Sequence, residues 1–344
     1  MKIVIDSAIP FIRGVFETYA EVVYKEGSLI NREDLIDTDA LIIRTRTRCN
    51  ENLLNGTSVK IIATATIGTD HIDLDYCQKN GIFVANAAGC NAGGVMNYVF
   101  SALYGTAARK SINLTGATMG IIGVGNVGNR VAQMARTLGF KLKLYDPPRA
   151  EAEGPAGFCS HDELLAESDI VTMHVPLNEE TRRMADSSFF EKMKSGAIFI
   201  NAARGELVDD NALIEAIPRL GPVIIDTWNN EPEINNRLLT MVDIATPHIA
   251  GYSYQGKQIG TSSVVRAVAR YFGLNDLFTF YPATDVPELA AVKLDMYGKT
   301  QGEIAAIFQY NYPVFTDDFM FRMNPGGFES LRTNYQYRKE FFVD

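Results

Sequence analysis

The chain has 344 residues, of which 47% are hydrophobic and 21% are charged. At roughly 100–200 residues per domain, this length predicts two domains with room for a smaller third segment. The composition is that of a globular protein and excludes a disordered or fibrous one. The formal net charge is −9, from 32 Lys and Arg against 41 Asp and Glu. Because nucleic-acid binding needs a dense basic surface, this balance argues against a nucleic-acid partner.

The N-terminus and the cysteines bear on the location of the protein. The N-terminal segment begins with apolar residues but reaches a carboxylate at Asp6, which is too early for a signal peptide, and no apolar run approaches the ~18 residues of a membrane span. None of the four cysteines stands in a CxxC pair: Cys49, Cys77, Cys90 and Cys159. Their spacing favours neither a zinc site nor a disulfide framework. We therefore expect a cytoplasmic protein with no bound metal and no membrane association.

Short β-branched segments recur along the first part of the chain. They predict strands at 2–6, 21–24, 40–44, 59–64 and 81–84, with helices at 10–19 and 70–80. Alternating strands and helices are typical of a parallel sheet covered by helices.

A second series of strands follows a long helical segment at 95–108. We expect these strands at 119–123, 141–146, 170–175, 197–201, 223–226 and 243–246, and a further helix at 261–272. Beyond Gly273, prolines and aromatic clusters indicate a small α+β segment. The predicted fold class is therefore α/β, with a flavodoxin-like and a Rossmann domain, both doubly wound parallel sheets, and a small C-terminal α+β domain. The expected boundaries are 1–94 with 252–275, then 95–251, then 276–344.

A glycine motif follows the apolar strand at 119–122. Gly123, Gly125 and Gly128 form a GxGxxG pattern that opens a segment with helical spacing. The first glycine permits a tight turn, the second lets the backbone approach a pyrophosphate, and the third allows close helix–strand packing. The motif alone is weak, but the order of strand, glycines and helix favours a dinucleotide site over a chance turn or a methyltransferase pocket. Candidate cofactor contacts are Gly123, Gly125, Asn126, Val127 and Gly128.

Asp146 ends the next strand, roughly 20 residues past the glycines. A carboxylate at this place hydrogen-bonds the ribose hydroxyls of NAD and repels the 2′-phosphate of NADP. We therefore predict NAD as the cofactor, with NADP left as the alternative by the nearby Arg149.

Oxidation of an alcohol by NAD needs a base for the hydroxyl proton and a clamp for the substrate. Of the four histidines, His248 follows a strand at the carboxyl edge where open α/β sheets bind ligands, and we predict it as the base. His71 and His161 stand near helix starts, His161 with an expected solvent-facing side chain. His174 could line the cofactor pocket or serve a structural role.

The two preceding strands end near further candidate catalytic residues. Glu231, with Glu233 as the alternative, is placed to orient His248 and to stabilise its imidazolium form. Arg204 is placed to hold a substrate carboxylate in a bidentate pair. The alternative is an ordinary surface ion pair.

The ordered motifs GxGxxG, Asn-Ala-Ala-Arg-Gly at 201–205, Asp-x-Trp-x-x-Glu-Pro at 226–232 and Thr-Pro-His-Ile-Ala-Gly at 246–251 resemble the NAD-dependent D-2-hydroxyacid dehydrogenases. The resemblance covers residues 1 to about 270. It implies Arg204 as the carboxylate clamp, Glu231 as the partner of His248, and His248 as the proton acceptor. It also implies cofactor contacts at Val175, Ala202, Ala203, Arg204, Asp226 and Gly251.

The segment beyond residue 275 resembles a particular group within this family. Pro-Gly-Gly-Phe at 325–328 and Leu-Arg-Thr-Asn-Tyr at 331–335 resemble members of this family that oxidise 4-phospho-D-erythronate at C2 to 2-oxo-3-hydroxy-4-phosphobutanoate, in vitamin B6 biosynthesis. The resemblance implies a homodimer formed through 276–344, and substrate contacts at Thr45, Thr66 and Tyr252.

Two local features remain, the first read from the residues themselves and the second from a difference to the family that the chain resembles. Arg44, Arg46 and Arg48 alternate with threonines, so we hypothesise that Arg44 with Thr45 holds the substrate phosphate; a solvated charged loop is the alternative. The segment Gly93-Gly94 and Asn97 stand where family members carry better helix formers and often an acidic residue, which we expect to loosen the connection between domains.

Two other functions stay open at this point. One is another D-2-hydroxyacid dehydrogenase, acting on glycerate or 3-phosphoglycerate. The other is an NAD-responsive, corepressor-like binding protein, against which the aromatic C-terminal segment and the presence of all three catalytic residue types argue.

Overall fold

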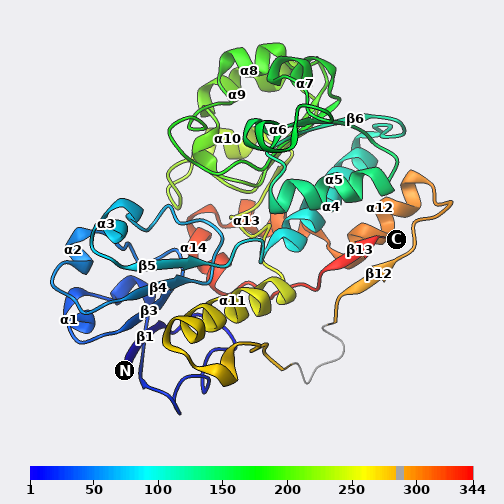
Figure 1. Ribbon diagram of the computed structural model, residues 1–344. Coiled ribbons are helices and arrows are strands. Elements are labelled where there is room, and N and C mark those ends of the chain that lie inside the picture. Colours follow the sequence, from blue (N-terminus) through cyan, green and yellow to red (C-terminus); the bar gives the residue numbers. More distant parts are fainter. Residues whose placement is uncertain (284–289, 344) are drawn as a thin grey trace. The chain divides into compact units, whose positions relative to one another are not determined.

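The structure is a computed structural model that describes residues 1–283 and 290–343. The chain forms two compact units (Figure 1). Unit 1 comprises Met1–Asn91 and Tyr254–Ala290, and unit 2 comprises Ala92–Ser253 and Ala291–Asp344. The residues that follow Ala290 thus fall in the same unit as the second sheet, while the three-domain division of the sequence analysis stays a prediction. Among the described helices, none combines the length and apolar character needed to cross a bilayer.

Unit 1 is built on a five-stranded parallel sheet with the order β2-β1-β3-β4-β5. Residues that alternate along a strand lie on opposite faces, which separates two cores. Val4, Leu41 and Ile62 pack with the short helices α1, α2 and α3, whereas Ile3 and Ile42 pack with α11. The elements are β1 (Lys2–Asp6), β2 (Glu21–Lys25), α1 (Arg32–Leu35), β3 (Ala40–Ile43), α2 (Glu51–Leu54), β4 (Ile61–Thr64), α3 (Leu74–Lys79), β5 (Phe83–Asn86) and α11 (Tyr254–Phe272).

The helix predicted at 10–19 is wrong, because this segment is a series of turns. Ile12 and Phe16 are buried at a spacing of four residues, which imitates the apolar side of a helix. The backbone of Phe11 is left-handed, with a φ of 61°, and the carboxylate of Glu17 accepts bonds from the N–H groups of Gly14 (2.8 Å) and Phe16 (3.0 Å). Local hydrogen bonds to a side chain have replaced those of a helix.

Unit 2 contains a six-stranded parallel sheet with the order β11-β10-β9-β8-β6-β7. The strand order reverses at β6, which lies between β7 and β8, and such a switch point is where open α/β sheets bind ligands. The elements are α4 (Ala92–Lys110), β6 (Thr118–Ile122), α5 (Asn126–Thr137), β7 (Lys141–Tyr145), α6 (Pro147–Glu153), α7 (His161–Glu167), β8 (Ile170–Met173), α8 (Ser187–Lys192), β9 (Ile198–Asn201), α9 (Asp210–Ala216), β10 (Val223–Ile225), α10 (Asn236–Met241) and β11 (Ile244–Ala245).

The C-terminal segment of unit 2 adds a two-stranded parallel sheet and three helices. The helix α12 packs against α4, and α13 packs against α4 and β11. The elements are β12 (Val292–Leu294), α12 (Gln301–Asn311), α13 (Val314–Met323), α14 (Phe328–Thr333) and β13 (Phe341–Val343). The predicted fold class, two parallel α/β sheets with a small α+β segment, is confirmed.

The unusual residues at the start of α4, Gly93 and Asn97, are explained by their contacts with the C-terminal segment. A Cβ atom on Gly93 would lie 2.1 Å from Oε2 of Glu340, so a larger residue there would require the buried carboxylate of Glu340 to move. The buried side chain of Asn97 pairs with the backbone of Phe341, donating to its carbonyl (2.7 Å) and accepting from its N–H (3.0 Å). These residues therefore match the C-terminal segment, and the acidic group stands on that segment rather than on α4.

Candidate active site

The turn between β6 and α5 has the geometry that a pyrophosphate requires. Gly123 has a φ of 85°, and a Cβ there would lie 2.8 Å from the carbonyl carbon of His174. A Cβ on Gly128 would lie 1.9 Å from the carbonyl oxygen of Gly123, so the helix approaches the turn closely. Around Gly125, by contrast, a Cβ would meet nothing within 4 Å. Gly125 also caps α5 without a side-chain bond, so the first N–H groups of the helix are available to an anion.

Asp146 lies beside this turn at the end of β7. Its Oδ2 accepts a bond of 2.7 Å from the N–H of Val124, and its Oδ1 accepts one of 3.1 Å from the N–H of Arg149. The guanidinium of Arg149 is engaged with the carbonyl of Val124 (2.7 Å) and with Glu153 (2.6 and 2.7 Å). The turn thus carries the carboxylate of Asp146, which suits ribose hydroxyls and disfavours a 2′-phosphate, beside a guanidinium that is already paired with Glu153.

The residues that follow β8 also lie against the β6–α5 turn. Nε2 of His174 lies 3.0 Å from the hydroxyl of Thr172, and burial lowers the pKa of His174 to about 3. Its ring is therefore neutral at physiological pH. The side chain of Val175 would contact a Cβ on Gly123 at 2.8 Å, which places Val175 directly against the glycine motif.

The segment after β9 presents Arg204. The amide of Asn201 donates to the carbonyl of Arg204 (2.8 Å) and accepts from the N–H of Ala203 (3.1 Å), so this turn is fixed by its own side chain. A Cβ on Gly205 would lie 1.9 Å from the carbonyl carbon of Trp228, which brings the turn into contact with the loop that follows β10. Arg204 itself is partly exposed, and its Nη1 donates to the carbonyl of Ala203 (2.7 Å).

The loops after β10 and β11 bring Glu231 and His248 together. Nδ1 of His248 lies 2.7 Å from Oε2 of Glu231, and the other carboxylate oxygen accepts a bond of 2.9 Å from the N–H of Trp228. Burial by itself raises the pKa of Glu231, but His248, Arg332 and the Trp228 N–H outweigh it and lower that pKa below its ordinary value. Glu233, the alternative partner, is exposed. The structure therefore pairs His248 with an ionised Glu231.

Asp226 holds the backbone that follows β11. Its carboxylate accepts bonds from the hydroxyl of Thr246 (2.6 Å), the N–H of Ile249 (2.9 Å) and the N–H of Ala250 (2.9 Å), and the residue is 1% exposed. These three side-chain bonds of the predicted cofactor residue are thus all with the loop of His248. Gly251, also a predicted cofactor residue, ends the same loop and is partly exposed.

Sequence reasoning missed the part that the C-terminal segment plays at this site. The ring of Tyr252 packs edge-on against Tyr335 and Tyr337, at centroid distances of 6.0 and 6.3 Å. Arg332, at the end of α14, acts electrostatically on both Glu231 and Tyr252. The signal in the sequence was the segment Leu-Arg-Thr-Asn-Tyr at 331–335, which indicates a subfamily but not a site.

The substrate contacts predicted on unit 1 follow the carboxyl ends of its strands. Nη1 of Arg44 donates to the carbonyl of Ala8 (2.8 Å), and its Nε lies 3.9 Å from Asp6. Thr45 is exposed, and the hydroxyl of Thr66 lies 2.7 Å from that of Thr64. Arg44 is therefore partly engaged by the loop after β1.

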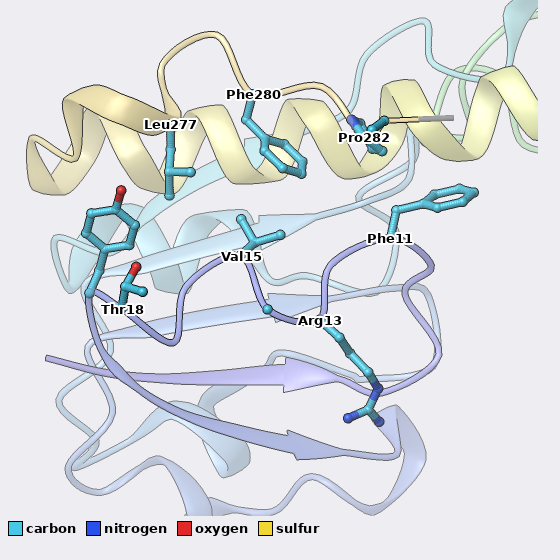
Figure 2. Close-up of a pocket in the computed structure, with 10 residues that line it drawn as sticks. Phe11, Arg13, Val15, Thr18, Leu277, Phe280 and Pro282 are labelled. Carbon is cyan, nitrogen blue, oxygen red and sulfur yellow. The ribbon is translucent and has the colours of Figure 1, made fainter. Parts of the chain in front are cut away.

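Two other features carry no site chemistry. A hollow of about 430 Å³ lies between the 7–20 loop and the segment after α11 (Figure 2). Its walls are largely apolar, with Phe11, Val15 and Phe280 among them, and no predicted site residue lines it. His161 was expected to face solvent, but its ring packs against Tyr145 and Phe189 at centroid distances of 5.1 and 5.4 Å.

Comparisons with known proteins agree with this geometry. Residues 98–250 match the model of the D-isomer specific 2-hydroxyacid dehydrogenase NAD binding domain. The chain is 43% identical over 347 residues to the erythronate-4-phosphate dehydrogenase of Bacteroides thetaiotaomicron, covering 99% of this chain and 97% of that protein. It is 40% identical over 352 residues to that of Escherichia coli O157:H7, covering 99% and 92%. The chain belongs to the D-isomer specific 2-hydroxyacid dehydrogenase family.

Solved structures of this family share the fold. The NAD⁺-bound 3-phosphoglycerate dehydrogenase of Entamoeba histolytica has a TM-score of 0.68 at 28% identity, and the match covers 83% of this chain and 99% of that one. The D-lactate dehydrogenase of Aquifex aeolicus has a TM-score of 0.67 at 24% identity, covers 83% and 100%, and is evidence for the fold alone. The similarity to the two erythronate-4-phosphate dehydrogenases extends over more of this chain than the similarity to these structures.

A D-isomer specific dehydrogenase needs a place for its dinucleotide, and the residues of unit 2 fit NAD. The open space at Gly125, the uncapped start of α5 and the carboxylate of Asp146 lie at one turn, within the matched NAD-binding domain. In the part of the chain that the structure describes, no three His, Cys, Asp or Glu side chains are grouped as metal ligands.

Proposed function

We propose that this protein oxidises the C2 hydroxyl of 4-phospho-D-erythronate to give 2-oxo-3-hydroxy-4-phosphobutanoate, in vitamin B6 biosynthesis. The observation that carries the proposal is the 2.7 Å pair of His248 and Glu231 in a chain that is 43% identical, over nearly its full length, to an erythronate-4-phosphate dehydrogenase. A cytoplasmic location fits this metabolic role.

His248 takes the proton of the substrate hydroxyl. Because the ionised Glu231 accepts a bond from Nδ1, that nitrogen carries the hydrogen, and Nε2 offers its lone pair to the hydroxyl. The negative charge of Glu231 also stabilises the imidazolium that forms. Arg204 holds the substrate carboxylate, for which its planar guanidinium is suited.

NAD, when bound, accepts the hydride that leaves C2. The residues that would hold it are the glycines of the β6–α5 turn with Asn126 and Val127, and Asp146 on the ribose. Val175, Ala202, Ala203, Asp226 and Gly251 remain proposed contacts.

We further propose Arg44, Thr45, Thr66 and Tyr252 as substrate contacts, with Arg44 and Thr45 on the phosphate. The support for Arg44 is its position directly after β3 in an otherwise acidic protein. Replacement of Arg44 by Lys keeps the charge beside Asp6 and removes the bidentate geometry, so the KM for the phosphorylated substrate should rise while that for an unphosphorylated hydroxyacid stays the same. Equal KM values for variant and wild type would remove Arg44 from the site.

We also propose a homodimer formed through the C-terminal segment. It is supported by a group of apolar side chains that are exposed on this segment, namely Tyr297, Tyr310, Phe319, Met320 and Met323. Large apolar groups gathered on one segment are typical of an interface.

The decisive experiment follows NADH formation by purified protein from NAD and 4-phospho-D-erythronate, with D-glycerate and 3-phospho-D-glycerate in parallel. The highest kcat/KM should belong to 4-phospho-D-erythronate. His248→Ala should lower kcat by roughly 10²–10⁴-fold, since a general base is lost, while the Kd for NADH stays the same. His161→Gln, in the same unit but packed against Tyr145 and Phe189, is the control and should retain activity.

Two outcomes would replace the proposal. A preference for D-glycerate or 3-phospho-D-glycerate would assign another activity of the same family. NADH binding without turnover of any hydroxyacid would favour the NAD-responsive binding protein.

A further inference from the structure

The catalytic base stands on a strained piece of backbone. His248 has a φ of 55°, in the left-handed region that side chains other than glycine rarely adopt. Such a conformation costs of order 1–3 kcal/mol and persists only where the surroundings hold it. The loop from Thr246 to Ser253 must therefore be held by contacts outside itself.

One set of contacts comes from Asp226 at the end of β10. Its carboxylate accepts the N–H groups of Ile249 and Ala250, the two residues that follow His248. These bonds hold two N–H groups of the loop, and within the loop the N–H of Tyr252 donates to the carbonyl of Ile249 (2.8 Å).

The carbonyl groups are held by Arg338, which lies in the C-terminal segment between α14 and β13 (Figure 1). Its Nη1 donates to the carbonyls of Ile249 (3.2 Å) and Tyr252 (3.1 Å). Its Nη2 donates to the carbonyls of Ala250 and of Gly94 in the first turn of α4 (3.3 Å). The peptide groups of Ile249 and Ala250 are thus held at the N–H by Asp226 and at the carbonyl by Arg338.

Arg338 is itself fixed in place. Its guanidinium carbon lies 3.8 Å from the ring centroid of Tyr312, and its Nη1 donates to the hydroxyl of Tyr335 (3.1 Å), which in turn donates to Asp317 (2.9 Å). Ser253, which forms a β-bridge with Arg338, donates to Glu340 (2.7 Å). A planar guanidinium with several fixed donors matches this set of acceptors, and a lysine ammonium does not.

We propose that Arg338 is a positioning residue for catalysis: it holds the loop of His248 in its left-handed conformation and so keeps the imidazole in line with Glu231. The C-terminal segment is then part of the catalytic machinery of its own chain. The expected loss of kcat rests on the proposed dehydrogenase activity, whereas the expected effect on the conformation of the loop does not.

The test compares Arg338→Lys with Arg322→Lys. Arg322 is a matched control because it lies in the same C-terminal segment and also donates to two backbone carbonyls, those of Leu239 (2.6 Å) and Val242 (2.8 Å), at the end of α10. For Arg338→Lys we expect kcat to fall roughly 10–100-fold, since a small misplacement of a catalytic group has an effect of this size. The Kd for NADH should rise less than kcat falls, because the glycine turn and Asp146 are untouched. The KM for substrate should rise as well, because Arg338 also donates to the carbonyl of Tyr252, a proposed substrate contact. Arg322→Lys should keep the wild-type kcat.

A second readout does not depend on the substrate. Amide hydrogen exchange of peptides that cover 246–253 should be faster in Arg338→Lys than in wild type, and unchanged in Arg322→Lys. A wild-type kcat for Arg338→Lys, unchanged exchange of 246–253, or an equal loss of kcat in Arg322→Lys would each overturn the proposal. If wild-type protein oxidises no hydroxyacid, the proposed function fails while the exchange comparison still decides the role of Arg338. Arg338→Met repeats the comparison without the positive charge. If Arg338→Met does not fold, the result for Arg338→Lys alone tests the proposal.

Discussion

Glu231 and Glu233 are two residues apart, yet only Glu231 bonds to His248. The loop that carries them turns sharply, with a left-handed backbone at Asn230 (φ 57°), and the N–H of Trp228 takes the second oxygen of Glu231. At this scale, function depends on backbone conformations that residue types alone do not specify. The same holds for His174, whose neutral state results from its surroundings.

His174 should make the protein less stable in acid. The pKa of a free histidine is 6.5, whereas burial lowers the pKa of His174 to about 3. As the pH falls below 6.5, His174 is protonated in the unfolded chain but not in the folded chain. The free energy of unfolding therefore decreases between pH 6.5 and about pH 3. At pH 4.5 the loss amounts to about 2–3 kcal/mol relative to neutral pH, at 1.36 kcal/mol per pKa unit.

The measurement is urea unfolding of wild type and His174→Gln at pH 7.5 and pH 4.5. Glutamine can keep the bond to Thr172 and has no proton to take up in this range. The stability difference between the two pH values should therefore be smaller in the variant. An equal loss in both proteins would show that His174 has no part in the acid sensitivity.

At the scale of elements, the β6–α5 turn and the 7–20 loop contrast. The turn was predicted correctly because its glycines report a local requirement, a tight bend followed by a helix. Within the 7–20 loop, residues 10–19 were predicted as a helix because the apolar residues Ile12 and Phe16 have helical spacing. In the structure these residues pack in the core formed with α11, which comes from residues 254–272, so the spacing had a tertiary cause.

The glycines of the β6–α5 turn should separate cofactor binding from folding. Gly125→Ala adds a methyl group where nothing lies within 4 Å, so the Tm should stay close to that of wild type. The methyl group occupies the space into which the pyrophosphate must come, so we expect the Kd for NADH to rise roughly tenfold or more, which corresponds to about 1.4 kcal/mol.

Gly128→Ala is the companion variant. Its methyl group would lie 1.9 Å from the carbonyl oxygen of Gly123, and overpacking of this kind costs about 1–3 kcal/mol or more. We therefore expect a lower Tm as well as weaker binding. NADH fluorescence titration and thermal unfolding measure the two effects, and a Tm for Gly125→Ala as low as that of Gly128→Ala would contradict the separation.

At the scale of the whole molecule, we propose two roles for the C-terminal segment. It supplies Arg338 and Glu340 to the loop of His248 and to the start of α4, and it carries the largest exposed apolar side chains of unit 2. Tyr297 is 93% exposed, Tyr310 88% and Met323 70%. Groups of this size on a water-facing surface favour a second copy of the chain as their partner.

The dimer should be measurable in solution. Light scattering or sedimentation should give twice the chain mass of 38.0 kDa. The double variant Phe319→Glu and Met323→Glu, which places charges on the exposed part of α13, should shift the protein to one chain mass. Leu29→Glu, which alters a 59% exposed residue of unit 1, is the control and should remain dimeric. A single chain mass for wild type at micromolar concentration would exclude the proposed interface.

Residue patterns alone predicted the two parallel sheets, the glycine turn with Asp146, and the positions of Arg204 and His248 after strands, with Glu231 and Glu233 as alternative partners of His248. Each of these is encoded in a few consecutive residues, and the rule that parallel strands present their carboxyl ends at one edge brings the separate motifs together. The tertiary structure was needed to distinguish Glu231 from Glu233, to show the turns of residues 10–19, and to show which backbone groups Asp226 and Arg338 contact. These depend on contacts between distant residues, such as Arg338 with Ile249, and no local pattern records which distant carbonyl a guanidinium will meet.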